Sequence, residues 1–170
     1  MDLLGLDYDS LLEMDLYGEA AFRKKQLFQW FHEKGVDYDQ MHSLPKALRQ
    51  KLAEDYPLPA LTLEKVFSSQ LDDTQKLLYL LGDGSLIEVV LMKYSYGWTI
   101  CLPSQVGCAM GCNFCASTLG GLVRNLTRSE MLRLYYLSRK RVGEIQRVVL
   151  MGSGEPLDNY DEVLGFIKLL

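Results

Sequence analysis

Three cysteines in the middle of the chain constrain its fold and chemistry more than any other feature. They are Cys108, Cys112 and Cys115, in the spacing C-x3-C-x2-C, and no fourth ligand lies beside them. A cubane iron–sulfur cluster has four irons, so three thiolates would leave one iron free to bind a further group. The spacing therefore favours a cluster with one open iron.

Two closed metal sites compete with this interpretation. Structural zinc takes four ligands and typically has two separated C-x2-C pairs, and ferredoxin-type clusters use four cysteines. The only histidines, His32 and His42, are far upstream, although Cys101 could complete a zinc site. Zinc and a closed cluster therefore remain alternatives on spacing alone.

The composition limits where such a chain could function. Its 170 residues are enough for one ordinary domain or two small ones, and no apolar stretch approaches the length of a membrane span. The acidic N-terminus does not look like a signal peptide. All four cysteines lie between positions 101 and 115, which differs from the distribution in a secreted disulfide framework. We predict a cytoplasmic protein without a membrane partner.

The charge is distributed unevenly. The net charge is −4, yet the cysteine-bearing segment is locally basic. Between positions 101 and 147 it carries Arg124, Arg128, Arg133, Arg139, Lys140, Arg141 and Arg147 against only Glu130 and Glu144. A local basic patch can attract a phosphate backbone, although a solvated helix face explains Arg139 to Arg141 equally well.

Residues 1–59 are predicted to form a small helical domain. Leu27, Trp30 and Phe31 have the spacing of an amphipathic helix that Gly35 would end, and Ser43 would cap the next helix. The basic run at 23–25 could touch RNA, although a solvated face is the simpler interpretation.

From residue 61 the pattern changes to strands. Residues 60–95 are expected to form a connecting hairpin region, and 96–170 the start of a core domain. The expected elements are strands at 77–81 and 86–93 around a Gly82-Asp83-Gly84 turn, a strand at 98–102, a helix from a Thr127/Glu130 capping box to about 141, a buried parallel strand at 147–151, and a final helix capped by Asn159.

The order strand, cysteine loop, helix, strand, glycine loop, helix predicts the opening of a parallel α/β fold. In such folds, ligands bind at the carboxyl ends of the strands. The cysteine loop and the loop Gly152–Pro156 both follow strands, so we expect them to face one another.

Several segments also match a known family. They are CLPSQVGC at 101–108, FCAST at 114–118, RNLT at 124–127, MGSGEPLDN at 151–159 and FRKKQLFQW at 22–30. Together they resemble the RlmN/Cfr branch of the radical S-adenosylmethionine (SAM) superfamily, and the amino-acid sequence at 115–121 favours the RlmN type. The resemblance implies a helical accessory domain followed by the first two units of a radical SAM partial (β/α)6 barrel.

The resemblance further implies an RNA methyltransferase acting on carbon 2 of adenine in 23S ribosomal RNA and transfer RNA; the alternative Cfr type acts on carbon 8. Cys108, Cys112 and Cys115 would hold a 4Fe-4S cluster, and Gly154, Glu155 and Phe114 would contact SAM. An electron donor such as flavodoxin or ferredoxin would be a further partner.

Two other residues acquire catalytic roles through the resemblance alone. Glu88 occupies the position of the family's proton acceptor, and Cys101 that of the cysteine that resolves a protein–RNA adduct by forming a disulfide. The family's methyl-carrying cysteine lies far downstream, beyond residue 170. The sequence therefore resembles the N-terminal half of such an enzyme, which alone should not complete the reaction. A non-catalytic RNA-binding fragment and a zinc-stabilised module remain the alternative interpretations.

Overall fold

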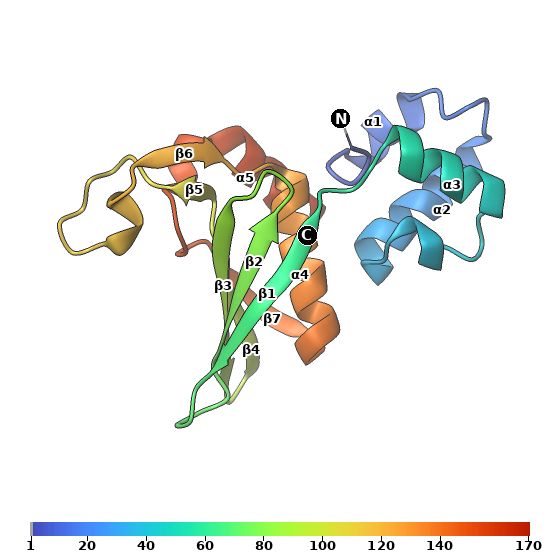
Figure 1. The fold of residues 1–170 in the computed structure, drawn as a ribbon. Coiled ribbons are helices and arrows are strands. Elements are labelled where there is room, and N and C mark those ends of the chain that lie inside the picture. The colour runs from blue at the N-terminus through green and yellow to red at the C-terminus, as the bar shows by residue number, and fades with distance from the viewer. Residues whose placement is uncertain (1) are drawn as a thin grey trace.

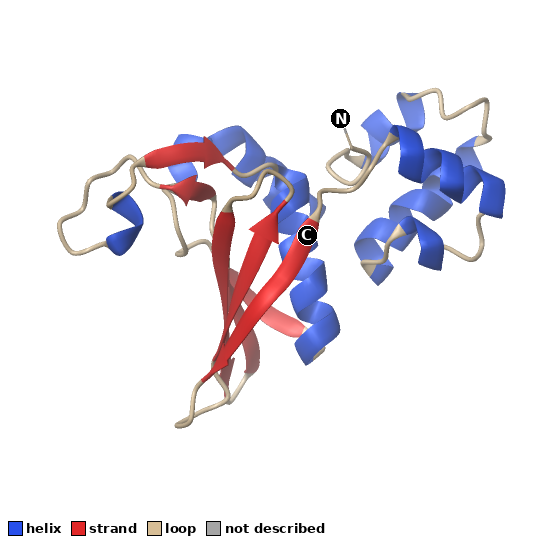
Figure 2. Ribbon diagram, in the orientation of Figure 1, coloured by secondary structure: helices blue, strands red, loops and turns tan. Residues whose placement is uncertain are grey.

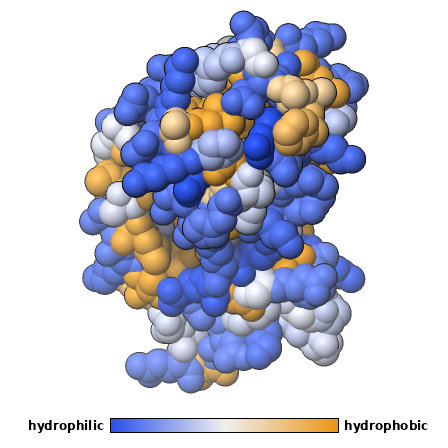
Figure 3. All heavy atoms as spheres, turned by 90° about the vertical axis from the view of Figure 1, so that its right-hand side faces the viewer, coloured by the Kyte–Doolittle hydropathy of each residue, from blue (hydrophilic) through white to orange (hydrophobic). Residues whose placement is uncertain are grey.

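The computed structural model describes residues 2–170 and contains a helical region followed by an α/β region (Figure 1). The helical region consists of α1 (Tyr8–Glu13), α2 (Ala21–Gln29), the π-helical turn η1 (Trp30–Lys34), the 3-10 turn η2 (Tyr38–Gln40) and α3 (Lys46–Asp55). Seen from its own side, this region presents a mainly hydrophilic surface with small apolar areas (Figure 3).

The helix predicted from the spacing of Leu27, Trp30 and Phe31 is present, but its last turn is π-helical. After α2 the chain continues into the π-helical turn η1, and Gly35 in the left-handed conformation ends it, as predicted. Leu27 and Phe31 face the core. The predicted Ser43 cap is wrong, because Pro45 is the N-cap residue of α3 and Ser43 Oγ instead accepts a hydrogen bond from Trp30 Nε1 at 2.7 Å.

The α/β region is built on a five-stranded sheet in the order β1-β2-β3-β4-β7 (Figure 2). Its strands are β1 (Leu61–Ser68), β2 (Gln75–Leu81), β3 (Leu86–Tyr94), β4 (Gly97–Cys101) and β7 (Ile145–Val149). Only β4 and β7 pair in parallel, and the other neighbours are antiparallel. The 60–95 segment is thus part of the same sheet as the core strands, and β1 extends it beyond the hairpin that the sequence predicted.

The two faces of this sheet differ in what covers them. Along β3, Ile87, Val89 and Leu91 are buried, whereas Leu86 and Glu88 between them are exposed. The buried face packs against α4 (Arg128–Val142), which lies behind the sheet in Figure 1. Side chains alternate across a strand, so the exposed Leu86 and Glu88 lie on the opposite face of the sheet. This exposed side is called the open face below.

The helical region packs onto α4. His32 Nδ1 and Tyr136 Oη are 2.9 Å apart, and Arg133 forms an ion pair with Asp37 at 2.6 Å. Apolar side chains of both regions belong to one continuous core. This contact attaches the helices to the sheet through α4.

The same contacts change the interpretation of the basic segment. Its cations mostly bind groups of the chain itself: Arg124 binds Asp83 and Glu130, Arg128 binds Glu162, Arg133 binds Asp37, Arg139 donates to the Glu33 carbonyl, Lys140 to Gln40 and Arg141 to Gln75. Most of the predicted basic patch therefore stabilises the fold rather than forming a free phosphate-binding surface.

The first parallel unit begins as predicted. Thr127 and Glu130 form the expected capping box at the start of α4, which ends at Val142. Strand β7 is parallel to β4 but starts two residues earlier than predicted, and as the edge strand it is only partly buried. A 3-10 turn, η4 (Pro156–Asn159), then leads into α5 (Tyr160–Leu169).

A second, two-stranded sheet supports the cysteine loop. Strands β5 (Gln105–Gly107) and β6 (Leu122–Asn125) pair in antiparallel fashion. The 3-10 turn η3 (Ala116–Thr118) lies in the long loop between them, which projects from the body of the molecule (Figure 1). This pair of strands was not predicted from the sequence.

Candidate functional site

A cavity of about 510 Å³ lies on the open face of the sheet, where β4 ends. It is lined by Leu78, Leu86, Ile87, Glu88, Val90, Cys101, Gly107, Cys115, Ser117, Met151, Gly152 and Ser153. Three separate parts of the chain thus meet there: the β2–β3 hairpin, the cysteine loop and the loop after β7. Eight of these residues belong to sites or motifs identified in the sequence, namely Glu88, Cys101, Gly107, Cys115, Ser117, Met151, Gly152 and Ser153.

The cysteine loop and the glycine loop face each other, which confirms the prediction from strand order. Cys101 is opposite Val149 in the parallel pair, so β4 and β7 end side by side. Beyond them the two loops are joined by backbone hydrogen bonds, from Gly152 N to Leu102 O at 3.1 Å and from Ser104 N to Ser153 O at 2.9 Å. The Ser153 hydroxyl donates to Gly107 O at 3.2 Å.

The Gln105 side chain holds the backbone of the glycine loop (152–156) in place. It is fully buried, and its Oε1 accepts a hydrogen bond from Glu155 N at 2.9 Å. Its Nε2 donates to Asn125 Oδ1 at 2.8 Å, so the amide is held at both ends. At Gly154, where φ is +101°, a Cβ atom would lie 2.6 Å from Gln105 Cβ. Only glycine fits here, both for its backbone conformation and for the close approach.

The Glu155 side chain already has one partner within the chain. Its carboxylate accepts a hydrogen bond from Leu157 N at 3.0 Å, as the N-cap of η4. The side chain is partly buried at the edge of the cavity-lining loop. A cap of this kind fixes the carboxylate in place while its second oxygen can accept a donor from a ligand.

Asn159 has a different role from the predicted one. It is the N-cap residue of α5, but its side chain makes no capping hydrogen bond. The buried Nδ2 instead donates to Ser104 O and Leu126 O, both at 2.8 Å, and so joins the segments on either side of the cysteine loop. Glu162, in the first turn of α5, accepts hydrogen bonds from Arg128. The sequence placed Asn159 in a family motif but gave no sign of these partners.

Cys101 and Glu88 both line the cavity from adjacent strands. Val90 is opposite Cys101, so Glu88 is its diagonal neighbour on the same face, roughly 7–8 Å away. Lys76 Nζ forms an ion pair with Glu88 Oε1 at 2.9 Å, and both side chains are substantially exposed. Burial raises the pKa of the half-buried Cys101 thiol, and the Met151 amide partly offsets this effect.

The cysteine loop is closed at its base but open at its tip. Cys108 N donates to Gly121 O at 3.1 Å, and Cys115 N donates to Cys112 O at 3.0 Å. In the described chain all four cysteines are free; Cys108 is buried and Cys112 is exposed. Within residues 2–170, no three His, Cys, Asp or Glu side chains converge to form a metal-binding group. Three free thiols in one loop suit a thiophilic centre by donor chemistry, and their role as ligands stays a prediction.

Phe114 is not brought into the cavity. Its side chain is 94% exposed and is absent from the cavity lining. Other large apolar side chains of this loop and of β6 are also exposed, namely Met110, Leu119, Leu122 and Val123. The predicted contact of Phe114 with a cofactor would therefore need the loop to fold inward.

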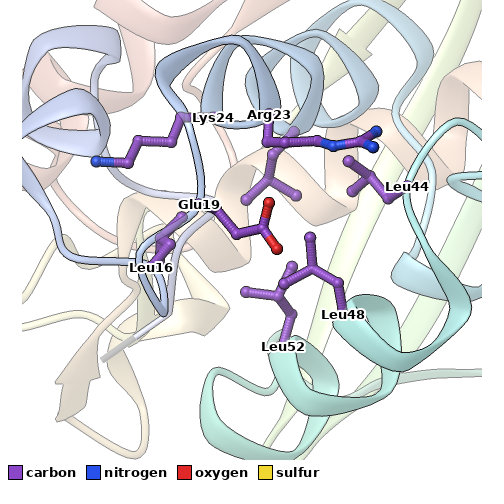
Figure 4. A pocket seen from close by; sticks show the side chains of 8 residues that line it. Leu16, Glu19, Arg23, Lys24, Leu44, Leu48 and Leu52 are labelled. Carbon is purple, nitrogen blue, oxygen red and sulfur yellow. The ribbon is translucent and has the colours of Figure 1, made fainter.

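The helical region contains a second cavity that is too small for a ligand. It measures about 10 Å³, about the space of one water probe. In Figure 4, Leu48 and Leu52 of α3 extend toward it, with the charged Glu19, Arg23 and Lys24 around it. It is a packing gap between helices. Among residues 2–170, no helix is long and apolar enough to cross a membrane.

The fold corresponds to about half of a solved radical SAM methyltransferase. The structure matches a crystal structure of a radical SAM methyltransferase from Sphaerobacter thermophilus with a TM-score of 0.92 at 38% identity. That match covers 100% of this chain and 52% of the other.

Sequence comparisons find similar proteins over the whole chain. Residues 1–57 match the family described as Ribosomal RNA large subunit methyltransferase N-terminal domain. The chain is 51% identical to a probable dual-specificity RNA methyltransferase RlmN of Lachnospira eligens over 99% of its own length and 49% of the relative. It is 48% identical to the protein of that name from Alkaliphilus metalliredigens, over 100% and 49%. Over its whole length the chain is thus similar to proteins named RlmN, and it spans about half the length of these curated relatives.

Proposed function

We propose that this chain supplies the cluster-binding and cofactor-binding part of an RNA (adenine) methyltransferase of the radical SAM class. The observation that carries the proposal is the cavity in which Glu88, Cys101 and Cys115 meet the glycine loop. With a 4Fe-4S cluster and SAM bound, such a site supplies radical chemistry that protein side chains cannot perform. The chain's own residues would bind, orient and shield these groups.

The cysteines and the glycine loop divide the binding between them. Cys108, Cys112 and Cys115 would hold the cluster as thiolates, because thiolate is the metal-binding form. Glu155 and the backbone at Gly154 would hold SAM, positioned by the hydrogen bond from Glu155 N to Gln105. Phe114 would contact SAM once the exposed loop closes over the cavity.

Cys101 and Glu88 would act on the substrate. In this proposal Glu88 accepts a proton from the adenine, and its ion pair with Lys76 keeps the carboxylate directed along the open sheet face. Cys101 would resolve a protein–RNA thioether: its thiolate would attack the thioether sulfur and form an S–S bond as the S–C bond to the RNA breaks, and the carbon that leaves with the electron pair would take up a proton. Burial raises the pKa of Cys101 and so disfavours this thiolate, which means that the resolving step would need a base to take the thiol proton.

Substrates and partners of the whole protein follow from its relatives. We propose 23S ribosomal RNA and transfer RNA as substrates, methylated at carbon 2 of adenine, since the relatives bear the name dual-specificity RNA methyltransferase RlmN. A flavodoxin or ferredoxin would deliver electrons. Free thiols in one loop require a reducing compartment, so the proposal includes a cytoplasmic location.

Anoxic reconstitution tests the proposal. After incubation with iron and sulfide, we expect about four irons per chain and the absorption of a 4Fe-4S cluster. Cys112→Ser should lose the cluster, whereas Cys101→Ser, outside the ligand loop, should retain it. Stoichiometric zinc binding with no uptake of iron and sulfide would refute the proposal and favour a structural zinc module.

A further inference from the structure

A stack of three side chains lies at the end of the sheet opposite the cavity. Tyr94 ends β3 and Tyr96 is in the turn before β4; their rings are stacked with centroids 5.2 Å apart and planes 12° from parallel. The Arg147 guanidinium of β7 lies 4.0 Å from the Tyr96 ring centroid. The order is therefore Arg147, Tyr96, Tyr94, with Tyr94 at the open end.

This stack shares the open face of the sheet with the cavity. Every second residue of β3 points to this face, namely Glu88, Val90, Met92 and Tyr94. Of these, Glu88 and Val90 line the cavity. Tyr94 is four residues beyond Val90, which corresponds to about 13 Å along the strand. An extended nucleotide strand with one base in the cavity could reach this distance, since stacked bases repeat at about 3.4 Å per strand.

The two tyrosine side chains pack on the sheet and also remain partly exposed to solvent. Tyr96 Oη is 3.2 Å from Thr99 Oγ1, and Thr99 beneath it is only 4% exposed. Packing explains that contact, yet Tyr94 and Tyr96 are themselves 47% and 43% exposed. Large areas of two aromatic side chains therefore face solvent beside a cation.

Arg147 also differs from the other basic residues of its segment. The cations from Arg124 to Arg141 bind carboxylates, carbonyls or amides of the chain, whereas Arg147 has no ion pair within residues 2–170. The stack thus combines aromatic surface with one uncompensated positive charge.

We infer that the Arg147–Tyr96–Tyr94 stack is an RNA-binding platform that takes an unpaired nucleobase of the substrate strand against Tyr94. Base stacking on aromatic side chains, reinforced by arginine, is how proteins commonly bind single-stranded nucleic acid. The inference rests on the proposed function, because it assigns to the RNA substrate a contact outside the cavity. A protein partner on the same rings is the competing outcome.

Fluorescence anisotropy with a labelled single-stranded RNA of about 12 nucleotides tests the inference on the 170-residue chain. Tyr94→Leu keeps the apolar bulk but removes the ring, and should weaken binding at least about fivefold. Tyr94→Phe should bind like the original chain. Tyr160→Leu, a matched change at an exposed tyrosine on α5, should have no effect. Arg147→Met should weaken binding. It should also reduce the slope of log affinity against log salt concentration by about one, the change expected for the loss of one phosphate contact.

Three results would overturn the inference: no RNA binding by the original chain, equal binding by Tyr94→Leu, or equal losses for Tyr94→Phe and Tyr94→Leu. Ultraviolet crosslinking of the unsubstituted chain gives a second readout that does not depend on a variant folding. Crosslinks at Tyr94 or Tyr96 support the platform, and crosslinks only elsewhere contradict it. Cluster content measured in parallel separates the two proposals, because a chain that binds the cluster but not RNA would retain the proposed function.

Discussion

At the scale of single residues, two buried amides organise the candidate site. Gln105 holds the backbone of the glycine loop, and Asn159 joins the backbone before and after the cysteine loop. Neither is expected to touch a reacting atom. Their importance lies in satisfying backbone groups that would otherwise be buried without partners, which is costly in a protein interior.

Replacement of Asn159 tests this role. Asn159→Ala leaves the carbonyls of Ser104 and Leu126 without their donor, so we expect a loss of about 2–4 kcal/mol in the free energy of unfolding. Urea unfolding followed by circular dichroism measures it. Asn113→Ala, at an exposed position, provides the control and should change stability by less than about 0.5 kcal/mol. A loss for Asn159→Ala no larger than that of the control would show that the amide is dispensable.

At the scale of elements, the sequence predicted structure wherever a local signal decides the outcome. The Gly82-Asp83-Gly84 turn, the Thr127/Glu130 box and Gly35 act through their own neighbours, and all three behave as predicted. Strands β5 and β6 pair across the cysteine loop and were not predicted, because neither forms without the other. Strand β1 was also not predicted, although its partner β2 is the next strand along the chain. The cap assigned to Ser43 is wrong, whereas Asn159 is the N-cap residue but makes no capping hydrogen bond; in both cases the side chain binds a distant group instead.

The contact between the helical region and α4 predicts a dependence of stability on pH. Burial lowers the pKa of His32 to about 4, so the folded chain keeps this residue neutral while the unfolded chain protonates it near pH 6.5. Between these values the unfolded state binds more protons, so stability is complete above about pH 6.5 and falls as the pH drops toward 4. From pH 7 to pH 5 we expect His32 to account for about 2 kcal/mol of lost stability.

Urea unfolding at pH 7 and pH 5 measures this loss. His32→Gln should remove this part of the pH dependence, because an uncharged amide does not titrate. His42→Gln changes the other histidine, which is exposed, and should retain the original dependence. Equal pH dependence in the original chain and in His32→Gln would contradict the assignment to His32.

At the scale of the whole molecule, one sheet links two functions through its open face. The covered face packs on α4 and through it on the helices, using most of the basic residues that the sequence suggested for RNA. The open face carries the cavity at one end and the Arg147–Tyr96–Tyr94 stack at the other. The sequence predicted that the cysteine loop and the glycine loop face each other, because parallel strands place their loops at one edge of the sheet. The absence of an ion pair at Arg147 within residues 2–170 could not be predicted, because pairing depends on three-dimensional neighbours.

The central claim is that the cysteine loop and the glycine loop form one site, and the electron paramagnetic resonance spectrum of the reduced, reconstituted chain tests it most directly. Added SAM should change the g values of the cluster, because the cofactor held by the glycine loop would bind the open iron. Gly154→Val should keep the cluster but abolish this response, since its side chain would clash with Gln105. A cluster spectrum that SAM leaves unchanged in the original chain would contradict the claim.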